Sequence, residues 1–377
     1  MRIAHVSDCF LPRLGGIERH VDDLARRQQA AGHDVEIITS VPGPPSASAV
    51  RVHRPAGHVG STTVRYRNSR RGSEVLRGGD FDVVHVHLST WSPLAFLTAR
   101  SACAYGLPVA ATVHSMWDYA TGMVSLSSRV SGWRKWPVAW SAVSGAAARP
   151  LINIVAGAPV SIVPNGIDEA AWALPVREPD QCRVAIASVM RLTARKRPRQ
   201  LFEILAQLRR RVPTDIRLDA MVIGDGPGRP KLQAELHRLR LGDWVSLTGA
   251  LSRAEIRERY RDVDLYVAPA TLESFGIAAL EARCAGLPVV AHAGTGVAEF
   301  VRPDVHGLLV DSDDAMVEAL ERLVTDTELR ATIAARNRLD RPRMTWDQVL
   351  DDCEQLYARA ATLSGRAAPA RVVGTGA

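Results

Sequence analysis

The sequence predicts an α/β protein with two doubly wound parallel sheets, and three observations indicate it. Short β-rich runs alternate with longer segments of helical apolar spacing, which is the pattern of βαβ units. These runs form two sets of about six, and the segment 164–182, with three prolines, separates the sets. The 377 residues are enough for two domains that each bury a core.

In the first half, the segment after the first strand has its apolar residues on one helical face from Ile17 to Ala25, and Gly32 is a typical helix stop. The predicted strands of this half are Ile3–Ser7, Val35–Thr39, Val83–His87, Val109–Val113, Ala139–Val143 and Ser161–Val163. Those of the second half are Val184–Val189, Arg217–Ile223, Trp244–Leu247, Asp264–Ala268, Pro288–His292 and Gly307–Val310.

These elements predict two Rossmann-like domains that face each other across a cleft, where the carboxyl ends of parallel strands bind ligands. We expect an N-terminal domain over 1–165, a linker over 166–182 and a C-terminal domain over 183–345. A C-terminal helix over 346–363 should return toward the N-terminal domain. The small, Gly- and Pro-containing tail over 364–377 should be disordered.

Composition excludes several classes of protein. Hydrophobic residues make up 46% of the chain, which is typical of a globular protein, and no run reaches the ~18 apolar residues of a membrane helix. The start MRIAHVSD resembles a strand, not a secretion signal. Five scattered cysteines without a Cys-x-x-Cys pair predict a reduced, cytoplasmic protein without structural zinc.

The net charge of +7 lies entirely in the first half. Residues 1–165 carry 17 Lys and Arg against 10 Asp and Glu, whereas the remainder is balanced. Residues 51–77 hold seven arginines and one acid, Glu74. This segment is either a solvated loop or a patch for an anionic partner such as a membrane surface or a phosphorylated acceptor. A nucleic-acid partner is not expected, because only Tyr66 could stack on bases.

The most informative stretch is ESFGIAALE, in which Glu273 precedes a predicted helix and Glu281 lies two turns inside it. The backbone N–H groups of Ser274, Phe275 and Gly276 can bind an anion at that helix start. The helix between the acids would span roughly 12 Å, about the distance from the ribose to the sugar of a nucleotide-sugar. The alternative is an acid favoured by the helix dipole and a second, exposed acid.

Two further motifs lie at strand-to-helix turns. Arg191 and Lys196 follow a strand and could bind a diphosphate and stabilise it as a leaving group. They could equally belong to a solvated basic face, because 191–211 has eight bases and one acid. Gly15 and Gly16 would let a ligand approach the backbone, although a tight turn also needs glycines.

This set resembles the family 4 retaining glycosyltransferases, whose GT-B fold has two facing Rossmann-like domains. The resemblance extends over nearly the whole chain and is most specific in the two glutamates in their strand–loop–helix context. Supporting motifs are LPRLGGIERHV, AAGHDVEIIT, DVVHVH, PVAATVHS, SAVS, VPNGID, IGDGP, LTGAL, GTGVAEFV, HGLLV and the closing TW.

The resemblance implies a nucleoside-diphosphate-sugar donor held by the C-terminal domain and an acceptor held by the N-terminal one. Glu281 would bind the ribose hydroxyls, and Glu273 would contact the donor sugar and its developing positive charge. Arg191 and Lys196 would bind the diphosphate. His114, in TVHS, would lie near C6 and the anomeric centre of the sugar.

The resemblance also implies that backbone groups bind the donor, from Ser274, Phe275, Gly276 and Ile277 and from Gly15 and Gly16. Many family members have EGFG where this chain has ESFG, and GG where it has Gly294-Thr295-Gly296. Neither departure removes a charged group, but both concern the shape of the sugar pocket.

The run MVIGDGPGRP imitates a dinucleotide fingerprint, but Pro227 interrupts its turn. About 20 residues on, where an acid should meet the ribose, the chain has Trp244 with only Asp243 nearby. We therefore do not expect NAD.

Two motifs suggest metal, and neither is expected to bind it. His85 and His87 share one strand face, but the sequence reveals no third ligand, so core or cleft histidines are expected. Asp262 and Asp264 resemble the Asp-x-Asp of another glycosyltransferase fold and are interpreted as structural.

Together with the resemblance, these features predict a retaining, metal-independent enzyme that transfers a hexose-type sugar from UDP or GDP to a hydroxyl acceptor. The resemblance implies front-face departure, in which the leaving phosphate helps to deprotonate the acceptor. The alternative is a non-catalytic nucleotide-sugar-binding or scaffold protein that kept the fold.

Location and acceptor are predicted from the charge of the first half. Arg65, Arg67, Arg70 and Arg71 cluster in a segment without a strand pattern. We expect a cytoplasmic protein that contacts the inner face of the membrane peripherally through its N-terminal domain. Its acceptor would then be anionic or lipid-linked, such as a phospholipid or a polyprenyl-phosphate-linked sugar.

Overall fold

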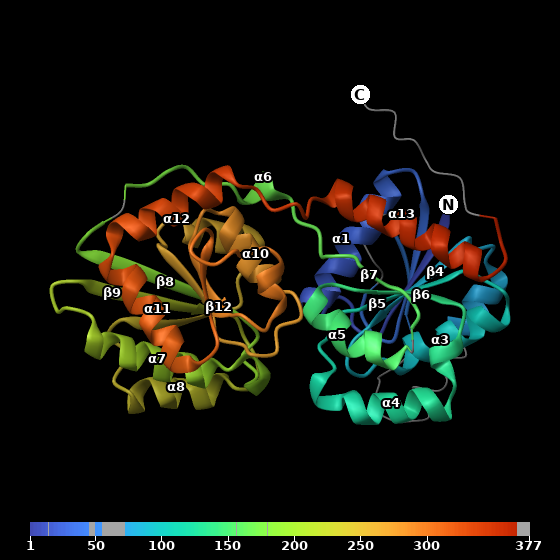
Figure 1. Cartoon of the computed structure of the whole chain (residues 1–377), viewed down its shortest axis with the longest axis horizontal. Coiled ribbons are helices and arrows are strands. Elements are labelled where there is room, and N and C mark those ends of the chain that lie inside the picture. Colours follow the sequence, from blue (N-terminus) through green and yellow to red (C-terminus); the bar gives the residue numbers. More distant parts are fainter. Residues whose placement is uncertain (14, 45–49, 55–71, 156, 179, 368–377) are drawn as a thin grey trace. The chain divides into compact units, whose positions relative to one another are not determined.

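The computed structural model describes residues 1–13, 15–44, 50–54, 72–155, 157–178 and 180–367, and the chain divides into two compact units. The first unit comprises Met1–Gly166 and Met344–Ala377, and the second comprises Ile167–Arg343 (Figure 1). The second unit is therefore inserted, along the chain, within the first.

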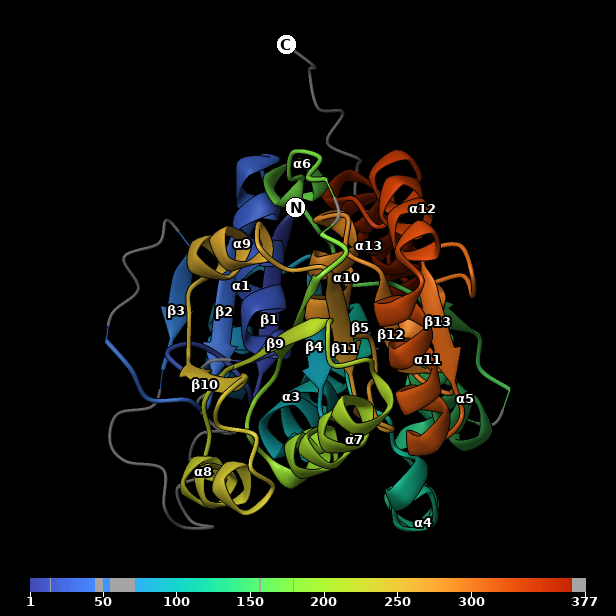
Figure 2. The same cartoon turned by 90° about the vertical axis from the view of Figure 1, so that its left-hand side faces the viewer.

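The first unit contains a seven-stranded parallel sheet in the order β3-β2-β1-β4-β5-β6-β7. The strands are β1 (Arg2–Ser7), β2 (Asp34–Thr39), β3 (Arg51–His53), β4 (Val83–Leu88), β5 (Val109–Val113), β6 (Val138–Ala142) and β7 (Val160–Ile162). Figure 2 shows the short edge strand β3 beside β2. The strand order reverses between β1 and β4, so their carboxyl ends form a topological switch point.

Helices cover both faces of this sheet, as parallel strands rich in valine and alanine require. Helices α1 (Gly16–Ala30) and α13 (Trp346–Leu363) share one hydrophobic core with the sheet. Helix α3 (Pro93–Ala104) packs on β4, β1 and β5, and α5 (Gly145–Ile154) packs on β6 and β7. Helix α4 (Thr121–Val130) lies against α5, flanked by the 3₁₀ turns η1 (Asp118–Ala120) and η2 (Trp133–Lys135).

The second unit contains a six-stranded parallel sheet in the order β10-β9-β8-β11-β12-β13. The strands are β8 (Arg183–Val189), β9 (Arg217–Ile223), β10 (Val245–Gly249), β11 (Leu265–Ala268), β12 (Val289–His292) and β13 (Gly307–Val310). The helices are α6 (Glu169–Trp172), η3 (Ala194–Lys196), α7 (Pro198–Arg211), α8 (Arg229–Arg238), α9 (Arg253–Tyr260), α10 (Ile277–Cys284), η4 (Gly296–Glu299), α11 (Asp313–Thr325) and α12 (Thr327–Leu339). Here the order reverses between β8 and β11.

Helix starts follow local sequence signals. Ser252 and Glu255 form a reciprocal capping box at α9, and Ser144 accepts a hydrogen bond from the Ala147 N–H at α5. Pro198 occupies the first turn of α7, where its missing N–H costs no intrahelical bond.

The α/β prediction and all twelve predicted strands are confirmed, with ends that differ by at most two residues. The sequence did not reveal β3, a three-residue edge strand, or the one-turn helix α6 inside the predicted linker. The clustered arginines 65, 67, 70 and 71 lie outside the described residues, as does the predicted tail from residue 368.

Candidate functional site

The two charged loops of the second unit follow neighbouring strands. Arg191 and Lys196 come after β8, and Glu273 comes after β11, which pairs directly with β8 in the sheet. Both loops therefore begin at the carboxyl ends of the two strands between which the strand order reverses, where open α/β sheets bind their ligands.

The start of α10 depends on a left-handed glycine. Gly276 has φ +94°, and a Cβ there would lie 2.7 Å from Cγ2 of Val297. Beside it, the ring of Phe275 is buried and its centroid lies 5.6 Å from that of Phe300. The backbone of Phe275 and Gly276 thus turns sharply into the helix that begins at Ile277.

One glycine of the Gly294-Thr295-Gly296 stretch is required by close backbone approach. A Cβ on Gly296 would lie 2.2 Å from the carbonyl oxygen of Ser274, and its N–H donates to the Glu273 carbonyl at 2.8 Å. A Cβ on Gly294 would meet no atom within 4 Å. The close approach that fixes the Glu273 loop therefore requires Gly296, and position 294 could hold a side chain.

The structure brings Lys196 and Glu273 together as an ion pair. Their side chains are 30% and 17% exposed, so the pair is partly open to solvent. Sequence spacing alone did not reveal this contact, which joins the loops after β8 and β11.

Arg197, which no sequence pattern singled out, anchors the Lys196 loop. Its φ is +57°, and its guanidinium donates to both carboxylate oxygens of Asp313, at 2.9 and 2.6 Å. It also donates to the carbonyl of Pro269 at 3.0 Å, directly after β11. Bidentate pairing of this kind fixes orientation as well as charge. The only sequence signal was a cation before Pro198, within a basic run.

Arg191 is exposed and forms no ion pair with any residue that the structure describes. Its neighbours pack against the glycine-rich loop after β9. A Cβ on Gly224 would lie 1.8 Å from the Met190 carbonyl oxygen, and one on Gly226 would lie 2.8 Å from that of Leu192. Gly224 and Gly226 are therefore required by the close approach of the backbone beside Arg191. This packing explains why the run MVIGDGPGRP resembles a dinucleotide-binding motif.

Glu281 is buried, so the alternative interpretation of an exposed acid is wrong. Its Oε1 lies 3.2 Å from Nε of Arg253, at the start of α9. Burial raises the pKa of Tyr266, and the nearby charges of Glu273 and Glu281 raise it further. The charges of both carboxylates therefore reach the same buried phenol, which belongs to β11.

Asp264, half of the Asp-x-Asp motif, has a structural role. It pairs with Arg177, and its Oδ2 accepts a hydrogen bond from the Ala185 N–H at 2.8 Å.

In the first unit, Gly15 and Gly16 lead from β1 into α1. Gly15 is extended, and a Cβ there would lie 2.3 Å from Oε2 of Glu18. Glu18 is buried and pairs with Arg13 at 3.2 Å, so this turn is closely packed by a carboxylate. Gly16 is the first residue of the helix.

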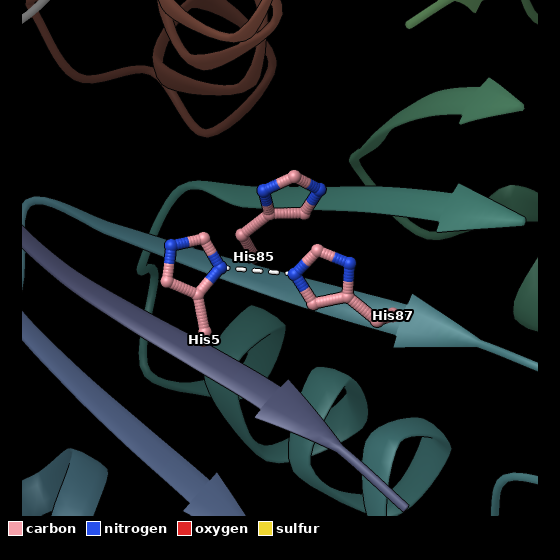
Figure 3. A group of neighbouring side chains, drawn as sticks. All are labelled: His5, His85 and His87. Atoms are coloured by element: carbon pink, nitrogen blue, oxygen red, sulfur yellow. Dashed lines mark hydrogen bonds between the residues drawn. The ribbon is translucent and has the colours of Figure 1, made fainter. Parts of the chain in front are cut away.

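His114 follows β5 and is 4% exposed. Its Nε2 lies 3.0 Å from Nδ1 of His87, whose Nε2 lies 2.9 Å from Nδ1 of His5. Figure 3 shows the His5 and His87 rings turned toward each other, with His85 beside them. The chain continues from His5 Nε2 to Oε1 of Gln28, on α1, at 2.6 Å.

A second branch leaves Gln28 on the other side of its amide. Gln28 Nε2 donates to the hydroxyl of Tyr357, on α13, at 2.9 Å, and this hydroxyl lies 2.9 Å from Nδ1 of His85. Nε2 of His85 then contacts Thr112 at 2.7 Å, and Thr112 contacts Ser141 at 2.7 Å. Buried polar groups on one sheet face therefore connect α1, α13 and four strands.

The amide of Gln28 sets the direction of the bonds from His5 to His114 when these rings are neutral. Because its NH₂ donates to Tyr357, its oxygen must accept from His5, so His5 carries its proton on Nε2. His5 Nδ1 then accepts from His87, and His87 Nδ1 accepts from His114. A neutral His114 consequently carries its proton on Nε2 and a lone pair on Nδ1.

These histidines are neutral in the folded protein. Burial lowers the pKa of His114 to about 3 and that of His5 to about 4. Burial, together with the neighbouring histidines, lowers the pKa of His85 and His87 well below the usual value.

The three histidines His5, His85 and His87 are also close enough together to be considered as a metal site. One ligand atom from each of His5, His85 and His87 lies within 4.8 Å of the others, so the structure supplies the third histidine that the sequence did not reveal. However, hydrogen bonds engage both nitrogens of each ring, and no carboxylate belongs to the group to offset a cation. The arrangement is that of hydrogen-bonded core histidines.

No helix within the described part of the chain has the length and apolar character needed to cross a membrane.

Comparison with known proteins identifies the family. Residues 177–340 match the model of the glycosyl transferases group 1, and residues 14–171 match that of glycosyltransferase family 4. A D-inositol 3-phosphate glycosyltransferase of Xylanimonas cellulosilytica is 29% identical, with 92% of each chain covered.

Two further relatives match along most of their length. A phosphatidylinositol N-acetylglucosaminyltransferase subunit of Arabidopsis thaliana is 26% identical, with 97% of this chain and 83% of the relative covered. A GDP-mannose-dependent alpha-mannosyltransferase of Mycolicibacterium smegmatis is 29% identical, with 97% and 98% covered.

Among solved structures, Anabaena HepE in complex with UDP-glucose superimposes with a TM-score of 0.74 at 18% identity, covering 95% of this chain and all of that one. The two family models match successive halves of the sequence, and both halves have the expected parallel α/β sheets. The chain therefore belongs to the group 1, family 4 glycosyltransferases and has the GT-B fold.

Proposed function

We propose that the protein transfers a hexose-type sugar from a UDP- or GDP-sugar to a hydroxyl acceptor, with retention of configuration and without a metal ion. One observation carries this proposal. In the second unit, Lys196 pairs with Glu273 at the switch point between β8 and β11, directly before the N-terminus of α10. A cation and helix N–H groups suit a diphosphate, and the carboxylate suits the sugar.

In this proposal the donor lies along α10. Arg191 and Lys196 bind the diphosphate, assisted by the backbone from Ser274 to Ile277. Glu281, two turns into the helix, binds the ribose hydroxyls. Glu273 contacts the donor sugar and stabilises the positive charge that develops as the leaving group departs.

His114 provides the contribution of the first unit to the sugar. The residue would lie near C6 and the anomeric centre of the sugar, and the hydrogen-bond chain to Gln28 holds its ring in place. The leaving phosphate deprotonates the acceptor on the same face, so no side-chain nucleophile is required. Gly15 and Gly16 provide backbone beside the donor.

The acceptor is proposed to be anionic or lipid-linked. Relatives are named for inositol 3-phosphate and for phosphatidylinositol, and both of these molecules carry phosphate. The excess of positive charge in residues 1–165 supports the same acceptor class and peripheral contact with the cytoplasmic membrane face.

Calorimetric titration with UDP-glucose, UDP-N-acetylglucosamine and GDP-mannose tests the donor site. We expect one nucleotide class to bind, and Glu281→Ala to weaken that binding. Release of free nucleotide without an acceptor then separates an enzyme from a non-catalytic binding protein, because only the enzyme hydrolyses the donor slowly.

Transfer to inositol 3-phosphate and to phosphatidylinositol vesicles compares acceptor sources, and the anomeric configuration of the product, read by NMR, tests retention. Absence of binding to all three donors, or inversion at the anomeric carbon, would overturn the proposal.

A further inference from the structure

Helix α4 of the first unit presents an apolar stripe to solvent. Tyr119 lies in the 3₁₀ turn η1, and Met123, Leu126 and Val130 follow it in α4 at spacings of three and four residues, which places these three on one helical face. Their exposed fractions are 56%, 72%, 64% and 81%. We call these four side chains the α4 stripe. Contiguous exposed apolar surface of this kind marks an interaction site.

The stripe is not needed to hold α4 in place. The opposite face of the helix is packed, with Ser128 buried and donating to the Ser125 carbonyl at 2.7 Å. Trp133, in the following 3₁₀ turn, is buried against Trp140 and Phe96. One face of α4 therefore packs against the rest of the unit, and the exposed apolar residues on its other face do not contribute to this packing.

An exposed tryptophan lies near one end of the stripe. Trp91 is 69% exposed, and its neighbour Thr90 accepts a hydrogen bond from the Tyr119 hydroxyl at 2.6 Å. Tryptophan and tyrosine are the side chains that favour the boundary between lipid and water, because each has an apolar body and a polar edge.

Positive charge surrounds the other end. Arg129 and Lys135 are exposed, and Arg134 is half-buried. None of the three forms an ion pair with a residue that the structure describes. Residues 83–165 contain five bases and a single acid, Asp118. An apolar stripe beside unpaired cations complements a surface that is both apolar and anionic.

We propose that the α4 stripe, Trp91 and the adjacent cations dock the first unit on an anionic lipid surface, with the stripe entering the headgroup region. A helix with one apolar and one anchored face binds in the plane of the interface in this way. The inference deepens the proposed lipid-linked acceptor, since it names the surface that would bring the unit to such an acceptor.

The charge distribution favours lipid over a second copy of the chain. A two-fold contact between parallel α4 stripes would bring Arg129 and Lys135 of one copy close to the same residues of the other, and an antiparallel contact would set these cations against the single acid Asp118. Residues 83–165 contain no acid besides Asp118 that could offset this repulsion. Phosphate headgroups offset it directly, and each basic residue near such a surface adds about 1 kcal/mol.

Co-sedimentation with vesicles of phosphatidylcholine and phosphatidylglycerol, and with phosphatidylcholine alone, tests the proposal. The test variant is Met123→Ser, Leu126→Ser and Val130→Ser together. The matched control carries the same change at three exposed apolar residues elsewhere, Val176, Leu339 and Leu363. All of these positions are exposed, so circular dichroism and thermal unfolding should match the parent.

We expect the parent and the control to bind anionic vesicles, and the test variant to bind at least about tenfold more weakly. Replacing Arg129, Arg134 and Lys135 with glutamine should remove the preference for phosphatidylglycerol. Equal binding by parent and test variant, or no binding by the parent at low salt, would overturn the proposal. The proposal would also be overturned if the parent formed a dimer in solution without vesicles and the test variant did not.

Donor hydrolysis in solution separates this inference from the proposed function. The test variant should hydrolyse the donor as the parent does. If the protein binds no donor but still binds vesicles through the α4 stripe, the docking proposal is supported and the transferase proposal is rejected.

Discussion

Replacing Tyr357 with phenylalanine should destabilise the first unit although it removes a single oxygen atom. That hydroxyl accepts from Gln28 Nε2 at 2.9 Å and lies 2.9 Å from Nδ1 of His85. Gln28, His85 and Tyr357 are at most 2% exposed, so water is not expected to replace the missing oxygen.

The expected cost follows from the two groups left without a partner. Each unsatisfied buried group costs roughly 1–3 kcal/mol, so the free energy of unfolding should fall by about 2–6 kcal/mol. The lower end applies if the amide of Gln28 rotates to recover one of its bonds. The loss of apolar area is negligible, because the phenyl ring remains.

Urea unfolding followed by tryptophan fluorescence measures this cost, since six of the eight tryptophans lie in the first unit. Tyr105→Phe is the matched control in the same unit. Its hydroxyl accepts from Arg77 at 2.9 Å at an exposed site, where water replaces it, so it should change stability by less than about 0.5 kcal/mol.

Tyr260→Phe, in the second unit, offers a contrast, because its buried hydroxyl has no hydrogen-bond partner within the described structure. It should be neutral or stabilising. A cost for Tyr357→Phe no larger than that for Tyr105→Phe would refute the directed hydrogen-bond chain and with it the tautomer assigned to His114.

Three other predictions concern the site and the pH. Glu281→Ala should mainly raise the donor KM. Glu273→Ala should mainly lower kcat, because the activation barrier should rise by about 2–4 kcal/mol. Equal, small effects of both variants on KM and kcat would contradict the two roles. EDTA should leave transfer unchanged, while Arg191→Ala should slow it even at saturating donor, and activity restored only by Mg²⁺ or Mn²⁺ would reject the metal-independent mechanism. The pKa values of His5 and His114 fall to about 4 and about 3 on folding, so the unfolded chain binds more protons in acid than the folded chain does. The free energy of unfolding should therefore be highest above about pH 6.5 and should fall by about 1.4 kcal/mol per pH unit for each histidine as the pH falls toward 4. Urea unfolding at several pH values would measure this loss.

The sequence predicted the sheets well because buried parallel strands are local patterns. Runs such as Val83–Leu88 and Arg183–Val189 are buried on both faces, and their valine and alanine content alone identifies them. Strand β3 has only three residues, two of them Arg51 and His53, and its position at the sheet edge does not require apolar side chains.

The site was less accessible to sequence reasoning, because its contacts join distant segments. Nothing local distinguishes Arg197 from the other cations of its run, since its partner Asp313 lies 116 residues away. In the same way, the glycines at 224 and 226 match a nucleotide pattern, and only the approach of the Met190 and Leu192 carbonyls explains them. The burial of Glu281 also depends on α9, which a helical pattern around residue 281 does not include.

The return of α13 to the first unit has a consequence for synthesis of the chain. Its residues from Trp346 to Ala360 belong to the core that the sheet shares with α1, and Tyr357 completes the buried hydrogen-bond chain. On the ribosome, the whole of the second unit is made before these residues emerge. A nascent chain that ends near Arg343 should therefore carry a folded second unit, while the first still exposes to chaperones and proteases the part of its sheet that α13 later covers.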